Sequence, residues 1–264
     1  MSRAPFLLVF LCVVFVAAAD PVTNPAEQIA LGRALTSDLR TLQPRESVTN
    51  SAALRMRDAK GRRSELRVEF RTLVSATNWS SWYIASGTNG HIATLAVHNA
   101  ANQPSRYLVR TGADESKPLA AITGNDTMRP FAGSDYWLAD LGLAFFNWPE
   151  QRVLRKELRS GEACRVLESV NPNPAPGAYR RVVTWIDNDT LGIVHADAYD
   201  SDNKLLKEFA PKKFRKVKGQ WQLEEMEIRN EQTDTRTTII FDLQPLKSEP
   251  SPTPVSPAPS AKPQ

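Results

Sequence analysis

The chain has 264 residues, with 33 Lys and Arg against 29 Asp and Glu, so its net charge is +4 at pH 7 and its isoelectric point lies near 9.1. A basic chain can bind nucleic acid, but the N-terminal sequence predicts secretion, which removes the chain from the nucleic acids of the cytoplasm. An anionic membrane surface is therefore the expected partner of a basic patch.

The N-terminus has the features of a secretory signal peptide. Arg3 supplies a positive charge, residues 6–16 form an apolar run, and residues 17–19 are three alanines where a signal peptidase would cleave. The run is shorter than the roughly 20 residues that span a bilayer. We expect residues 1–19 to be removed, which leaves Cys164 as the only cysteine and allows no intramolecular disulfide.

The C-terminal residues 245–264 are rich in Pro and Ser, a composition that cannot bury a core and predicts a disordered tail. Residues 20–244 are long enough for one large domain, and they contain no repeat and no internal linker.

The first predicted element is an amphipathic helix from Pro25 to Thr41. Asn24 is a good N-cap, Pro25 suits the first helical position and Glu27 favours the first turn. Its apolar stripe should cover one face of a sheet. The stripe consists of Ile29, Leu31, Leu35, Leu39 and Leu42.

Alternating apolar residues then predict a hairpin that turns at residues 58–61, and further strands at Trp79–Ser86, Ile92–His98 and Arg106–Arg110. The short connections require antiparallel pairing.

Residues 134–148, here called the aromatic segment, interrupt these strands. Ser134 as N-cap and Asp135 in the first turn predict a short helix from Asp135 to Leu143, and Pro149 ends the segment. Its large apolar residues are Tyr136, Trp137, Leu138, Leu141, Leu143, Phe145, Phe146 and Trp148.

Seven more strands are expected after Pro149. They lie at Gln151–Arg159, Ala163–Val170, Ala178–Asp187, Leu191–Tyr199, Lys204–Phe214, Trp221–Arg229 and Thr235–Leu243. A flat sheet of about a dozen strands would curl or split, because twist accumulates. We predict an α+β fold with a strongly curved antiparallel sheet that forms an incompletely closed β-barrel, and with helices covering or plugging its open concave side. The strand pattern alone would also allow a sandwich.

Candidate catalytic and metal-ligating residues are few. None of His91, His98 and His195 has a partner at metal-ligand spacing, so we expect no metal and no cofactor. The chain has no Gly-x-Ser-x-Gly motif and no phosphate-binding glycine loop. Carboxylates such as Glu224 and Glu225 fit exposed strand faces. We predict that the protein is not an enzyme.

The order of several motifs resembles one family. The motifs are Phe131-Ala132-Gly133-Ser134-Asp135-Tyr136-Trp137, a hairpin at Ser160-Gly161, the strand Ala163–Glu168, Trp185-Ile186-Asp187, residues 199–207, Gly219-Gln220-Trp221 and the strand Thr237–Phe241. In this order they resemble a divergent branch of the outer-membrane lipoprotein-sorting family, the LolA/LolB-like periplasmic carriers. The resemblance covers somewhat under half of the chain in detail.

The resemblance implies a periplasmic protein of a Gram-negative-type envelope that binds acyl chains in a hydrophobic cavity, for transport or sorting of lipoproteins towards the outer membrane. Movement of the aromatic segment would gate the cavity. The implied partners are an acylated lipoprotein or lipid and the inner- and outer-membrane sorting machinery. We expect no nucleic-acid partner, and we expect the protein to be a monomer. A lipid or lipoprotein sensor that binds a regulatory protein is the alternative, and a lipid hydrolase is a third hypothesis from a different class.

Two sets of site residues are predicted. The lipid-binding cavity is expected to be lined by Val68, Phe70, Trp82, Ile84, Leu95, Val97, Trp137, Leu138, Leu141, Phe145 and Phe146. The membrane or partner contact is expected at Lys212, Lys213, Arg215 and Lys216, a run that an edge strand protected by lysines also explains.

Overall fold

A computed structural model describes residues 20–101, 103–217 and 220–243. The predicted signal peptide and the predicted C-terminal tail lie outside these residues. In the described chain, one sheet of 14 strands has the order β1-β8-β9-β10-β11-β12-β13-β14-β2-β3-β4-β5-β6-β7, and neighbouring strands pair antiparallel. The pairing of β14 with β2 joins the last described strand to one from the N-terminal part of the chain, while β1 and β7 form the two edges.

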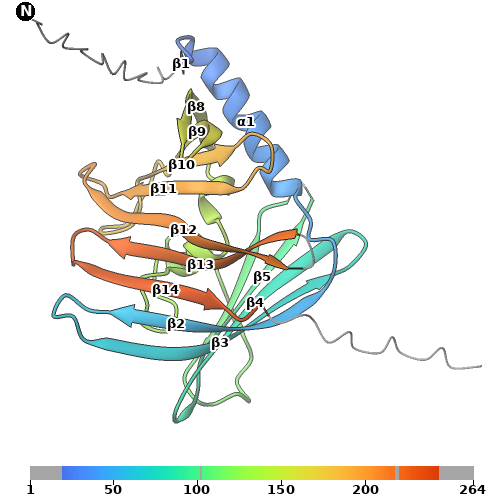
Figure 1. Ribbon diagram of the computed structural model, residues 1–264, viewed down its shortest axis with the longest axis vertical. Helices are drawn as coiled ribbons and strands as arrows, with labels where there is room; N and C mark the ends of the chain where they lie inside the picture. The colour runs from blue at the N-terminus through green and yellow to red at the C-terminus, as the bar shows by residue number, and fades with distance from the viewer. Residues whose placement is uncertain (1–19, 102, 218–219, 244–264) are drawn as a thin grey trace, which may run out of the picture.

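The sheet is strongly curved and incompletely closed, and the aromatic segment lies behind it in the view of Figure 1, on its concave side. This confirms the predicted fold class. The strands are β1 (Asp20–Pro21), β2 (Val48–Arg57), β3 (Arg63–Val74), β4 (Asn78–Gly87), β5 (Gly90–Ala100), β6 (Arg106–Thr111), β7 (Ala120–Ile122), β8 (Glu150–Arg159), β9 (Glu162–Val170), β10 (Arg181–Asp187), β11 (Ile193–Tyr199), β12 (Leu205–Val217), β13 (Gln220–Asn230) and β14 (Thr235–Phe241).

Helix α1 (Pro25–Thr41) has the predicted bounds, and the Asn24 side chain accepts a hydrogen bond of 3.0 Å from the Ala26 amide. The helix lies across the end of the sheet that contains β8 (Figure 1). Leu35 is buried on its inner side. A Cβ atom on Gly32 would lie 2.5 Å from backbone atoms of Gln151 and Arg152, so this glycine sets how closely α1 approaches β8.

The aromatic segment is less helical than predicted. Helix α2 covers only Leu138–Leu141, and the 3₁₀ helix η2 covers Ala144–Asn147. Ser134 is not the N-cap, because its hydroxyl donates to the Phe131 carbonyl at 2.7 Å within a turn. Leu143 adopts a left-handed conformation, with φ of 51°, and breaks the helix there. The prediction of one helix from Asp135 to Leu143 is therefore wrong in extent.

Replacing Gly32 with valine should push α1 away from β8 and lower the free energy of unfolding by about 2 kcal/mol or more, since the backbone of β8 cannot move aside cheaply. The measurement is chemical denaturation. Ala34→Val, at an exposed position of the same helix, controls for helix propensity and should cost about 0.5 kcal/mol. Equal losses in the two variants would contradict the close contact.

Candidate functional site

A cavity of about 1160 Å³ lies on the concave side of the sheet, between the aromatic segment and the strands β4, β5 and β10–β13. Most of its wall is apolar. Representative lining residues are Leu141, Phe145 and Phe146 of the aromatic segment, Ile193, Ala196 and Ala198 of β11, Phe209 of β12, and Met226 and Ile228 of β13. The cavity is slightly larger than the range of about 300–1,000 Å³ that is typical of small-molecule sites, and its wall suits an apolar ligand.

Four of the predicted cavity residues lie in this wall. They are Val97, Leu141, Phe145 and Phe146. Val68, Leu95 and Leu138 are buried together in the adjoining core, and Phe70 packs against Tyr83 with ring centroids 5.1 Å apart. These four residues pack against residues of the wall without lining the cavity themselves. Trp137 stacks on Tyr179, which does line the cavity, at 4.4 Å.

Trp82 and Ile84 do not line the cavity. Ser81 and Tyr83 line it, and successive side chains of a strand point to opposite faces, so Trp82 and Ile84 lie on the outer face of β4. Trp82 there packs edge-on against His98, with centroids 6.0 Å apart. Placing these two residues in the cavity was wrong, because the period of two gives two faces without saying which one is inner.

The sequence interpretation missed the wall that β11, β12 and β13 contribute. The signal was present as alternation, since Ala196 and Ala198 face inward while the polar His195 and Asp197 between them face outward. Alanine is common at buried positions of strands, so its presence in the sequence does not indicate a binding site, although its small side chain leaves room for a ligand.

A buried polar cluster interrupts the apolar wall. The Lys207 side chain is only 2% exposed, and its ammonium donates a hydrogen bond of 2.6 Å to the Asp135 carbonyl. The same Nζ lies 3.7 Å from Oδ2 of Asp140 and 3.6 Å from the ring centroid of Trp137. Asp140 also accepts hydrogen bonds from the Trp137 amide at 2.7 Å and from the Tyr179 hydroxyl at 3.1 Å. The cluster joins β12 to the aromatic segment.

Burial governs the protonation of this cluster. Desolvation lowers the pKa of Lys207 to about 8, against the opposing attraction of Asp140 and Asp135. Desolvation also raises the pKa of Asp140, although Lys207 and the hydrogen bonds from Trp137 and Tyr179 oppose the shift. Each group therefore keeps its charge mainly because the other is present.

A second set of contacts ties the segment to β14. The Asp135 carboxylate accepts hydrogen bonds from the hydroxyls of Thr235 at 2.5 Å and Thr237 at 2.7 Å, and the Asp135 amide donates to Thr237 at 2.9 Å. Asp135, which we expected in the first turn of a helix, instead anchors the turn before the helix to the sheet. The aromatic segment is thus held at both β12 and β14.

The basic run lies on a two-stranded ribbon that projects from the sheet, formed by residues 211–217 of β12 and 221–224 of β13. In the described chain, β12 pairs with β11 only over residues 205–209, and β13 pairs with β14 only over residues 225–230. Residues 211–217 of β12 are therefore an edge strand, as the alternative explanation of the lysines requires. Residues 205–209 of β12 lie in the interior of the sheet, between β11 and β13. The ribbon's basic residues are Lys212, Lys213, Arg215 and Lys216.

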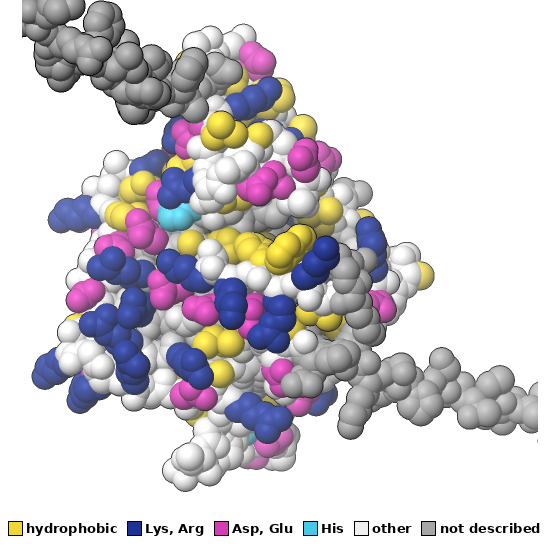
Figure 2. All heavy atoms as spheres, in the orientation of Figure 1, with side chains coloured by type: hydrophobic (Ala, Val, Ile, Leu, Met, Phe, Trp, Pro, Cys, Tyr) yellow, Lys and Arg dark blue, Asp and Glu magenta, His cyan; other side chains and the backbone are white. Residues whose placement is uncertain are grey.

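The ribbon also carries exposed aromatic residues at the cavity. Phe214 is 53% exposed and Trp221 is 71% exposed, and both belong to the cavity lining together with the exposed Leu42 and Leu143. Figure 2 shows a hydrophobic patch beside Lys and Arg side chains at this end of β12 and β13, below α1. Ion pairs at 3.2 Å join Lys212 to Glu227 and Lys213 to Glu224. The rim of the cavity is therefore apolar with basic flanks.

The histidines are engaged in different ways, and none lines the cavity. His91 is hydrogen-bonded to the Gly112 carbonyl and the Thr94 hydroxyl, at 2.7 and 2.8 Å. His195, which the sequence left without a partner, contacts Asp197 at 2.6 Å on the outer face of β11. Within the described residues, no helix is long and apolar enough to cross a membrane.

Comparisons with solved structures show which known fold the chain shares. A putative outer membrane lipoprotein-sorting protein domain from Vibrio parahaemolyticus superposes with a TM-score of 0.66 at 17% identity, covering 81% of this chain and 91% of that one. A DUF1329 family protein from Desulfovibrio piger gives 0.64 at 18% identity, covering 82% and 92%. A LolA superfamily protein from Nitrosomonas europaea gives 0.56 at 13% identity, covering 84% and 95%. The fold is the LolA-like incomplete barrel.

A family model described as "Uncharacterized protein" matches residues 95–248, more than half of the chain. The chain belongs to that family, and its LolA-like fold confirms the predicted resemblance at the level of the fold. No curated protein sequence matches the chain.

Titration of Lys207 should make the protein more stable as the pH rises from about 8 to about 9.5. In this window the unfolded chain still holds the lysine proton, with its ordinary pKa of 10.5, while the folded chain with a pKa of about 8 releases it. The free energy of unfolding should rise by up to about 1.4 kcal/mol per pH unit. Denaturation across this pH range measures the slope.

Lys207→Met should abolish the slope, whereas Lys204→Met, at an exposed position of the preceding turn, should keep it. The same slope in both variants would mean that Lys207 does not titrate in this range.

Proposed function

We propose that this protein is a periplasmic, non-enzymatic carrier that binds acyl chains of a lipoprotein or related lipid and moves them towards the outer membrane. The observation that carries the proposal is the 1160 Å³ apolar cavity with an exposed hydrophobic rim. The lipoprotein-sorting fold of the Vibrio domain and the LolA superfamily fold of the Nitrosomonas protein support the same class of cargo.

The driving force follows from the size of the cargo. A chain of about 16 carbons gains roughly 12 kcal/mol on leaving water, at about 0.8 kcal/mol per buried methylene. A cavity that captured the whole chain would not release it. The open rim leaves part of a chain in contact with water or membrane, which weakens net binding and permits handover.

The expected gating by the aromatic segment is disfavoured by its contacts. Moving the segment would separate Lys207 from Asp140 and would break the hydrogen bonds of Asp135 to β14. Separating a buried charge pair is costly. We therefore propose that cargo enters and leaves past the ribbon and the end of α1, while the segment stays in place.

The ribbon is proposed as the membrane contact. Trp221 and Phe214 can enter the interfacial region of a bilayer, where aromatic side chains are favoured, while Lys212, Lys213, Arg215 and Lys216 face anionic head groups. This arrangement would place the cavity rim against the membrane from which a chain is taken.

Two alternatives remain distinguishable. A sensor would bind lipid in the same cavity but would form a stable complex with a regulatory protein, which a carrier does not require. A hydrolase needs a nucleophile and a base that converge on the cavity, and the described cavity wall contains no histidine. The carrier is therefore the better supported proposal.

Cargo binding is tested by native mass spectrometry of the protein purified without detergent from the envelope of its own source. A bound lipid or acylated peptide is the expected result.

Ile193→Asp places a charge in the cavity wall and should weaken binding of a fluorescent fatty acid by about tenfold or more. Leu158→Asp, at an exposed position outside the lining, is the control. An empty protein with equal affinities in both variants would reject the carrier.

Membrane contact is tested by sedimentation with vesicles that contain an anionic phospholipid. The double variant Phe214→Ser, Trp221→Ser should bind about tenfold more weakly, because two apolar anchors are lost. Leu158→Ser, which also removes an exposed apolar side chain, should bind like the unchanged protein. Unaltered binding of the double variant would exclude the ribbon as the contact.

A further inference from the structure

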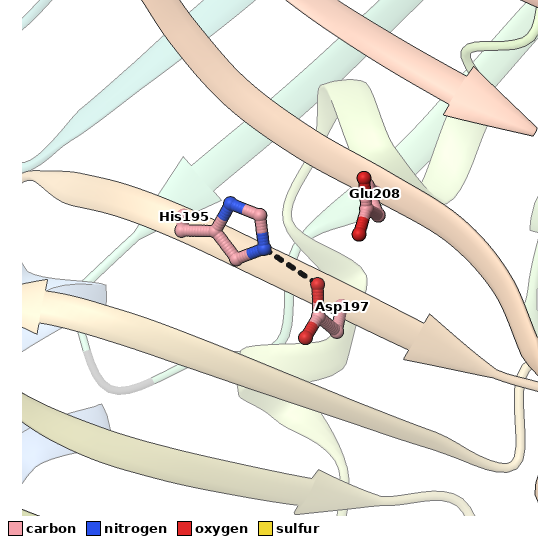
Figure 3. A group of neighbouring side chains, drawn as sticks. All are labelled: His195, Asp197 and Glu208. Carbon is pink, nitrogen blue, oxygen red and sulfur yellow. Dashed lines mark hydrogen bonds and ion pairs between the residues drawn. The ribbon is translucent and has the colours of Figure 1, made fainter. Parts of the chain in front are cut away.

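Three potential metal-ligating side chains converge on the outer face of the sheet. His195 and Asp197 lie two residues apart on β11, and Glu208 lies directly opposite Asp197 on β12. One ligand atom of each lies within 4.8 Å of the others. Figure 3 shows the imidazole, bonded through Nε2 to Asp197, and the Glu208 carboxylate turned towards the same point.

Two carboxylates lie directly opposite each other in this cluster, on β11 and β12. Like charges directly opposite each other on antiparallel strands repel. In the described chain, neighbouring cations are engaged elsewhere. Arg229, which faces Glu208 from β13, pairs with Glu231 and Asp234, at 3.1 and 3.3 Å. No ion pair links Glu208 to a described Lys or Arg.

Other cations next to the cluster are also committed. Lys207 points to the concave side towards Asp140. Arg181 lies over the Tyr199 ring at 3.9 Å and pairs with Glu168 at 3.4 Å. The cluster therefore combines two carboxylates with one imidazole, and no described Lys or Arg forms an ion pair with Glu208 or Asp197.

The imidazole is held in place by its surroundings. Trp185 lies edge-on to His195 with ring centroids 5.1 Å apart, and the indole donates a hydrogen bond to Glu157. The guanidinium of Arg159 lies over the Trp185 ring, 4.2 Å from the ring centroid. The side chains of His195 and Asp197 are 12% and 15% exposed, so the cluster is sheltered but reachable from solvent.

We propose that His195, Asp197 and Glu208 bind one divalent first-row transition ion, of the Zn²⁺ or Mn²⁺ type. One imidazole nitrogen and two carboxylate oxygens suit such ions, whereas Ca²⁺ and Mg²⁺ prefer oxygen ligands alone. Nε2 would exchange its bond to Asp197 for the metal, and water would complete the coordination. The ion would join β11 to β12 beside Ala196 and Ala198, which form the cavity wall on the opposite face.

The test uses the full chain, stripped with a chelator and titrated with Zn²⁺ and Mn²⁺ by calorimetry, with Mg²⁺ and Ca²⁺ for comparison. The expected result is one Zn²⁺ or Mn²⁺ per chain, preferred over Mg²⁺ and Ca²⁺, with a higher Tm in the bound state. His195→Gln and Glu208→Gln should each weaken binding by about tenfold or more. Circular dichroism checks that both variants fold.

His98→Gln is the matched control, because His98 also lies edge-on to a tryptophan, Trp82, at 6.0 Å. It belongs to no group of described residues that could hold a metal, and its variant should bind the ion normally. Absence of binding, equal affinity in Glu208→Gln and the unchanged protein, or an equal loss in His98→Gln would each overturn the proposal.

Discussion

The buried charge pair of Lys207 and Asp140 is the constraint on which the concave side of this protein depends. An ammonium that is 2% exposed inside an apolar half-barrel is stable only with a carboxylate, a carbonyl and an aromatic face around it. The aromatic segment supplies all three. It cannot continue as one regular helix from Asp135, because the Asp135 carbonyl goes to Lys207 and the Asp140 carboxylate caps the Trp137 amide. The packing of the cavity wall follows from this local chemistry.

The same constraint explains why the barrel stays open. The aromatic segment contributes to two buried clusters, one with β2–β6, β13 and β14 and the other with α1 and β8–β12. Irregular register in β8–β9, β10–β11, β11–β12 and β12–β13 bends this part of the sheet around it. The anchored segment acts as a spacer between the two halves, and the cavity is the volume that neither cluster fills.

The sequence predicted α1 and most strands because their signals are local, namely a cap followed by helical spacing and then alternation. The features that could not be predicted depend on contacts between residues far apart in the sequence. Asp140 and Lys207 are 67 positions apart, so neither the shortened α2 nor the buried cluster could be read from either residue. Trp82 and Tyr83 are similar neighbours in β4, and only the curvature of the folded sheet decides which one faces inward. Glu208 likewise meets His195 only through the pairing of β11 with β12.

The ribbon contains some residues that protection of a strand edge explains and one residue, Trp221, that it does not explain. Lysines on a strand edge, and a proline where β12 leaves β11, protect unpaired backbone from aggregation. That explanation accounts for Lys212, Lys213 and Pro211, but not for a tryptophan that is 71% exposed. A serine at Trp221 would protect the edge equally well and would expose less apolar surface. Trp221 lies where β13 pairs only with β12 in the described chain, in the rim of the 1160 Å³ apolar cavity, and an exposed apolar side chain at this place fits the membrane contact proposed above.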